Sequence, residues 1–175
     1  MGLSLDAARI RGEWLKHAAS GLPPLPLRDD APDNRWQRGA VVDALYLAES
    51  EETVWAEWYR HLAESGIPPE RALPRDLWRW RVDVKVADLR TEEQLARVGL
   101  ASPAPGRGTW PPFQAVGEEL WREGRRGLVA PSAARPDGLT LCLFRDDTDA
   151  VEGAEPVGRP RRVDAAPAPP VGMTT

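Results

Sequence analysis

The sequence predicts an α+β fold, in which a mixed sheet is flanked by helices. From Leu77 to Val86, apolar and polar residues alternate with the period of a half-buried strand. From Glu51 to Ser65, apolar residues recur with the spacing of one helix face. Strand and helix patterns do not follow one another in a regular β–α–β rhythm, which favours α+β over a doubly wound fold. A chain of 175 residues suits one domain with its own core.

The N-terminal third is the least regular part of the sequence. Residues 1–11 are interpreted as an N-terminal extension, and the predicted domain runs from 12 to 145. The segment Gly12–Ala19 is ambiguous, because its composition favours a helix while a short edge strand is also possible. A proline-rich loop, Gly21–Arg35, follows it, and loops of this length are often functional.

Three helices are predicted from signals at their ends. Ser50 can cap the helix that begins at Glu51, and Gly66 ends it. The other two helices are Glu92–Val98, where Thr91 and Gln94 have the spacing of a capping box, and Phe113–Glu123, which two prolines precede and a glycine follows.

Shorter strands and a tail complete the prediction. The strands are Ala44–Ala48, Gly127–Ala130 and Leu139–Phe144, and the last is apolar enough to lie in the centre of a sheet. From Asp146 the chain is rich in proline, alanine and charge and has no aromatic residue. Residues 146–175 are therefore predicted to be a disordered tail.

Composition excludes several classes of protein. A single cysteine, Cys142, excludes an internal disulfide, and the two histidines lack metal-ligand spacing, so no metal is expected. No apolar run reaches the length of about 18 residues that a membrane helix needs. With no recognisable secretory leader, a cytoplasmic protein is expected. The excess of 27 acidic over 23 basic residues argues against a broad nucleic-acid surface.

The stretch from Arg35 to Leu62 carries the candidate chemistry. Tyr46 lies eleven residues after Arg35 and eleven before Glu57. Glu57 falls near the edge of the apolar helix stripe, where a carboxylate is partly desolvated or lines a cleft. The residues also allow plainer readings. An Arg35–Glu57 pair can be a surface salt bridge, Tyr46 can be core, and Ser132 can cap a turn.

The ordered set of Arg35-Trp36, the segment LYLAES with Tyr46, Glu57, and APSAAR with Ser132 resembles the RES domain family. The resemblance covers about Gly12 to Arg145. It implies a fold related to ADP-ribosyltransferases and NAD as substrate. It also implies a toxin that cleaves the nicotinamide–ribose bond, passes ADP-ribose to phosphate, water or a protein, and is covered by an Xre-like antitoxin.

The resemblance assigns a role to each residue. Glu57 would stabilise an oxocarbenium-like ribose, Arg35 would bind the pyrophosphate, and Tyr46 would stack on the substrate or donate its hydroxyl. Ser132 would hydrogen-bond the nicotinamide amide or a phosphate, since nothing nearby in the sequence activates it as a nucleophile.

Two positions depart from the family pattern. Lys16, followed by His17, stands where the family has a further NAD-binding arginine, and Ala130 replaces a tyrosine. Lys16 keeps the charge but loses the planar two-point contact. The alternative is therefore a weakened relative that binds NAD or a partner as a regulator. An interaction module that uses Arg79, Arg81 and the Arg125–Arg126 pair is a third reading.

Overall fold

The computed structural model of the chain describes residues 2–26, 29–146 and 150–174. Strands and helices are both present there, and one strand pair is parallel while the others are antiparallel, which confirms the α+β class and the mixed sheet. In chain order the elements are β1 (Ala7–Ala19), β2 (Asp43–Ala48), α1 (Glu51–Ser65), β3 (Arg75–Asp88), α2 (Glu92–Ala96), α3 (Trp110–Arg122), β4 (Gly127–Pro131), β5 (Leu139–Arg145) and β6 (Ala154–Val163), with short 3-10 turns at Pro69–Ala72 and Arg107–Thr109.

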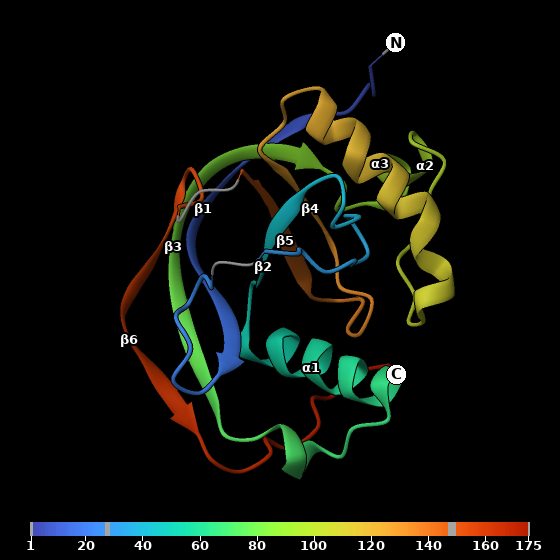
Figure 1. The fold of residues 1–175 in the computed structure, drawn as a ribbon. Coiled ribbons are helices and arrows are strands. Elements are labelled where there is room, and N and C mark those ends of the chain that lie inside the picture. The colour runs from blue at the N-terminus through green and yellow to red at the C-terminus, as the bar shows by residue number, and fades with distance from the viewer. Residues whose placement is uncertain (1, 27–28, 147–149, 175) are drawn as a thin grey trace.

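The sheet closes into a barrel. Its strand order is β1-β2-β5-β4-β3-β6, and β1 also pairs with β3 along thirteen positions, from Ala7–Ala87 to Ala19–Arg75. On its other edge, β3 pairs with two strands. The first half of β3 pairs with β6, and the end of β3 pairs with β4. Figure 1 shows β1 and β3 curving together along one side, with α1 below and α2 and α3 at the opposite end.

The alternation in β3 is confirmed. Trp80, Val82, Val84 and Val86 are buried, whereas the residues between them are exposed. The buried set packs against apolar residues of β2, β4 and β5 inside the barrel. β5 lies between β2 and β4, as its continuous apolar run predicts.

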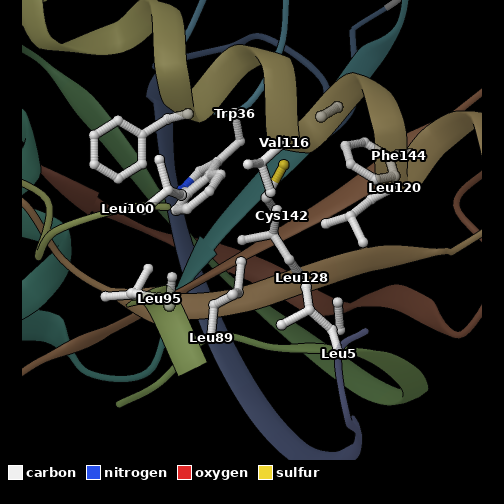
Figure 2. Close-up of a cluster of buried hydrophobic side chains, with 14 of the residues drawn as sticks. Leu5, Trp36, Leu89, Leu95, Leu100, Val116, Leu120, Leu128, Cys142 and Phe144 are labelled. Atoms are coloured by element: carbon white, nitrogen blue, oxygen red, sulfur yellow. The ribbon is translucent and has the colours of Figure 1, made fainter. Parts of the chain in front are cut away.

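A second core lies between α3 and the sheet. Figure 2 shows Val116 and Leu120 of α3 near Leu128, Cys142 and Phe144 of the sheet. Gly117 allows this close packing, because a Cβ there would lie 1.9 Å from the backbone oxygen of Trp36. The loop that carries Arg35 and Trp36 is thereby held against α3.

The predicted helix ends match the structure closely. Ser50 accepts from the backbone N–H of Thr53 at the start of α1, and Gly66 adopts a left-handed φ of 64° at its end. Thr91 and Gln94 form the predicted capping box. α2 ends earlier than predicted and α3 begins earlier, at Trp110.

The N-terminal segment is a strand. Gly12–Ala19 belongs to β1, and pairing with β3 across its whole length outweighs the local helix preference. The predicted N-terminal extension, residues 1–11, is also wrong in part. Ala7–Arg11 is the first part of β1, and Leu5 is buried in the core beside α3.

The prediction of a disordered tail is wrong for the part of residues 146–175 that forms a strand. Ala154–Val163 forms β6, which pairs with β3, and Val151 and Val163 are buried. Composition reflects side-chain burial, whereas β6 is held mainly by backbone pairing along an existing strand. Residues 147–149 and 175 of the predicted tail lie outside the described residues.

Candidate functional site

A pocket of about 270 Å³ opens where β1, β2, α1 and the loop before β2 meet. It brings together five of the six residues singled out from the sequence, and its wall also includes residues that the sequence did not suggest. The predicted residues on its wall are Lys16, His17, Arg35, Tyr46 and Glu57. Ser132, the sixth, is fully buried directly behind this wall.

Glu57 lies on α1 with its carboxylate fixed on both sides. Its Oε1 accepts a 2.6 Å hydrogen bond from the hydroxyl of Ser132, and its Oε2 accepts from Nε of Arg60 at 2.9 Å. The side chain is 24% exposed, so the carboxylate still faces the pocket. A carboxylate held in this way presents a negative charge of fixed direction.

Ser132 is the link between Glu57 and the β4–β5 loop. Its hydroxyl oxygen accepts from the backbone N–H groups of Ala134 and Arg135 at 3.1 and 3.0 Å while it donates to Glu57. The sequence-based interpretation assigned Ser132 to ligand binding. In the structure its contacts are with Glu57 and its own loop, and Ala133 rather than Ser132 lines the pocket.

Arg35 is buried, with 8% of the residue exposed, and its guanidinium carbon lies 5.2 Å from the centroid of the Phe113 ring. It donates to the hydroxyl of Thr109 at 2.9 Å and to the carbonyl of Ala104 at 2.6 Å. Burial, followed by repulsion from Arg60, lowers its pKa. Arg35 therefore supplies a positive wall to the pocket and also anchors the loop that leads into α3.

Tyr46 of β2 points its hydroxyl away from bulk water. The oxygen accepts from the backbone N–H of Trp36 at 3.2 Å. Burial, and then the neighbouring thiol of Cys142, raises its pKa well above the ordinary value. The ring is thus a neutral, fixed surface of the pocket.

His17 follows Lys16 on β1 and is held by an aromatic ring and an arginine. Its ring stacks on Trp55 with a centroid distance of 5.8 Å, and its Nδ1 lies 2.8 Å from Nη2 of Arg75. Since arginine can only donate, Nδ1 accepts and the ring proton is on Nε2. Burial, Arg75 and Lys16 lower the pKa of His17 well below its ordinary value.

Arg60 and His61 at this site were not predicted from the sequence, and Trp110 also lines the pocket. Arg60 bridges Glu57 and Glu64, and His61 and Trp110 complete the wall. Arg60 and His61 follow Glu57 by three and four positions, so they share its helix face. That spacing could have identified them.

A second hollow of about 590 Å³ adjoins the pocket. The two share Asn34, Arg60, His61 and Trp110 as lining residues. Arg107 lines the second hollow and lies 5.6 Å over the Trp110 ring. The lining of the two hollows includes the basic side chains Lys16, Arg35, Arg60 and Arg107 together with the acidic Asp33 and Glu57.

Within the described residues, no group of three or more His, Cys, Asp or Glu side chains is arranged to hold a metal ion. In the same part of the chain, no helix combines the length and the apolar character needed to cross a bilayer.

The family model of the RES domain matches residues 6–166. The chain belongs to the RES domain family. The match begins before β1 and extends past β6, so it includes every strand of the sheet that the structure describes. The resemblance seen in the sequence is thereby confirmed, over a longer range than predicted.

Two known proteins are similar to this RES domain. The probable NAD(+) phosphorylase Rv3189 of Mycobacterium tuberculosis (strain ATCC 25618 / H37Rv) is 27% identical over 111 residues, 63% of this chain and 52% of that protein. This chain thus matches about half the length of that relative. The crystal structure of the M. tuberculosis MbcT–MbcA toxin–antitoxin complex has a chain that superposes with a TM-score of 0.72. That match has 22% identity and covers 93% of this chain and 88% of that chain, which establishes the shared fold.

The pocket of this RES domain combines three chemical features. One carboxylate is fixed by a hydroxyl and a guanidinium, cationic groups surround it, and flat rings line the remaining wall. Such an arrangement can bind an anionic substrate with a planar group and stabilise positive charge that develops next to the carboxylate.

Proposed function

We propose that this RES domain cleaves NAD at the bond between ribose C1′ and the nicotinamide nitrogen. The observation that carries the proposal is the position of Glu57. Its carboxylate lies at the wall of a pocket that also contains Arg35, Tyr46, Lys16 and His17, and two hydrogen bonds from opposite sides fix it there. The name of the relative, a probable NAD(+) phosphorylase, supports the same substrate.

The chemistry needs little acid catalysis. When the C1′–N bond breaks, its electron pair moves to the pyridinium nitrogen, and nicotinamide leaves as a neutral molecule. The ribose then carries oxocarbenium-like charge, which a fixed carboxylate stabilises. Preorganised electrostatic groups of this kind typically contribute about 10²–10³ in rate each. Glu57 supplies the negative charge of that carboxylate. An oxygen of phosphate, or of water that gives up a proton to the solvent, then bonds to C1′.

The remaining residues bind and orient the substrate. Lys16, Arg35 and Arg60 surround the pocket with positive charge, which suits the pyrophosphate. Tyr46 and His17 provide neutral rings for the nicotinamide or ribose. The adjoining hollow, with Arg107 over Trp110, offers space and a stacking surface for the adenosine end. These assignments make Ser132 a positioning residue that acts through Glu57.

We further propose that the protein is the toxin of a toxin–antitoxin pair and acts in the cytoplasm. The shared fold with a chain of a toxin–antitoxin complex supports this role. In this proposal the antitoxin is an Xre-like protein that covers the pocket. We also propose that the fold is related to that of ADP-ribosyltransferases.

The test is to incubate the purified, folded protein with NAD, with and without phosphate, and to follow nicotinamide release. Release in both conditions indicates transfer to water, and release that requires phosphate indicates phosphorolysis. No release in either condition, in protein shown to be folded, would remove the enzymatic proposal. If NAD then raises the melting temperature without being consumed, the alternative of a regulator with Lys16 in place of arginine is favoured.

A further inference from the structure

The C-terminal residues after β6 cross the molecule beside the candidate site. We name residues 164–174 the strap. Ala166 packs against the apolar cluster of α1, and the hydroxyl of Tyr59 on α1 donates to the carbonyl of Pro167. Figure 1 shows the C-terminal end of the chain next to α1.

The far end of the strap is bound to the β4–β5 loop. The backbone N–H of Thr174 donates to the carbonyl of Ala134 at 2.7 Å, and its hydroxyl donates to the carbonyl of Ala133 at 3.2 Å. Ala133 lines the pocket, and the backbone N–H of Ala134 donates to the hydroxyl of Ser132. Thr174 thus binds the carbonyl oxygens of Ala133 and Ala134. The backbone amides of Ala134 and Arg135 bind the hydroxyl of Ser132.

The strap therefore connects the same two elements as the hydrogen bond between Ser132 and Glu57. Tyr59 is two residues after Glu57 on α1, and Ala133 and Ala134 directly follow Ser132. A change in the distance between α1 and the β4–β5 loop would lengthen both connections together. The loop has a further contact with α1 near Gly138, where a Cβ would lie 2.2 Å from the Thr53 hydroxyl. The fold thus holds the loop at both of its ends.

We propose that the strap is a positioning element for Glu57, with Thr174 and Tyr59 as the residues through which it acts. The inference rests on the proposed NAD cleavage and names part of this chain that lies mostly beyond the matched family region, residues 6–166. The strap keeps the Ser132 hydroxyl at the distance at which it can donate to Glu57. Without it, the carboxylate loses its fixed direction while the rest of the pocket remains.

The first variant is a chain that ends after Ala166, which keeps β6 and the apolar contact of the strap with α1. We expect its kcat to fall about 10- to 100-fold, because small misplacements of a reacting group cost that much, and its KM for NAD to change less than twofold. Amide hydrogen exchange at Ala134 and Arg135 should become faster. A merely stabilising tail would lower the melting temperature and leave both the kcat and the exchange of these two amides unchanged.

Point variants test the same inference if the shortened chain does not fold. Thr174→Pro removes both donors and should lower kcat, whereas Thr174→Ser keeps both donors and should restore it. Tyr59→Phe removes the other connection and should have the same direction of effect. Val171→Ser is the matched control, since Val171 is 93% exposed in the same segment.

The outcomes separate this inference from the proposed function. If the full chain releases no nicotinamide, the NAD proposal fails, and the exchange measurement alone decides whether the strap orders the Ser132 loop. If the full chain is active and Thr174→Pro and the shortened chain keep its kcat, the strap proposal is overturned and the function stands.

Discussion

The hydroxyl of Ser132 donates a 2.6 Å hydrogen bond to Glu57 across 75 positions of sequence. This bond joins α1 to the β4–β5 loop at the wall of the pocket. The same hydroxyl accepts hydrogen bonds from two backbone amides, which fix its position. Its hydrogen bond to Glu57 therefore fixes the orientation of the carboxylate. The candidate catalytic group is therefore oriented both from its own helix, through Arg60, and from outside it, through Ser132.

Glu57→Gln should reduce nicotinamide release by at least about 10²-fold, because the neutral amide cannot stabilise a developing positive charge. The amide oxygen can still accept from Ser132 but the amide nitrogen cannot accept from Arg60, so we expect a folded protein with a modestly lower melting temperature. Glu52→Gln, at an exposed position of the same helix, is the control and should keep full activity. Release from Glu57→Gln at the wild-type rate would reassign the role of this residue.

Ser132→Ala should lower kcat about tenfold and leave the KM for NAD nearly unchanged, since the variant frees the carboxylate without removing a pocket residue. Loss of a hydrogen bond to a charged group should also lower the free energy of unfolding by about 1.5–3 kcal/mol. Steady-state kinetics and urea unfolding measure the two effects, with the exposed Ser102→Ala as control. A raised KM with constant kcat would instead indicate direct contact with the substrate.

Arg107→Ala should raise the KM for NAD about fivefold, which corresponds to about 1 kcal/mol, because it removes the cation over Trp110 in the second hollow. Cleavage of nicotinamide mononucleotide, which lacks the adenosine end, should not change. Arg159→Ala, exposed on β6, is the control. Equal effects on both substrates would mean that the adenosine end binds elsewhere.

Stability should fall as the pH drops from about 6.5 to 5, because His17 resists protonation in the folded state. Its folded pKa is well below the ordinary value of 6.5, through burial and the nearby Arg75 and Lys16. The unfolded chain therefore binds the proton first, and the free energy of unfolding decreases through this range. His17→Gln should flatten the pH dependence measured by urea unfolding, and His61→Gln, whose pKa is lowered less, should flatten it less. An unchanged slope in His17→Gln would contradict this reasoning.

Periodic elements could be predicted from the sequence, and elements held by distant pairing could not. β3 and α1 each repeat one pattern long enough to identify them. β1 has no such alternation of burial, and only its thirteen pairings with β3 make it a strand. β6 buries a single residue, Val163, so its composition resembles that of a tail.

In the candidate site, too, some features could be predicted from the sequence, and features that depend on distant residues could not. The resemblance to the RES domain family brought Arg35, Tyr46 and Glu57 into one hypothesis, and the structure places them around one pocket. The partners of Arg35 are Ala104 and Thr109, which lie 69 and 74 positions away, and no spacing rule relates such residues. The contacts of Ser132 depend on the same kind of long-range approach, so its binding role could be proposed from the sequence and its positioning role could not.

The β6 strand is an edge of the sheet at which another chain could add a strand. Among the described strands, β6 alone has a single neighbour, and it contains Pro156 and Pro160. Proline has no amide proton to donate, so an incoming strand would find an interrupted row of donors. These two prolines thereby protect this edge of the sheet from edge-to-edge aggregation when the protein is made in large amounts.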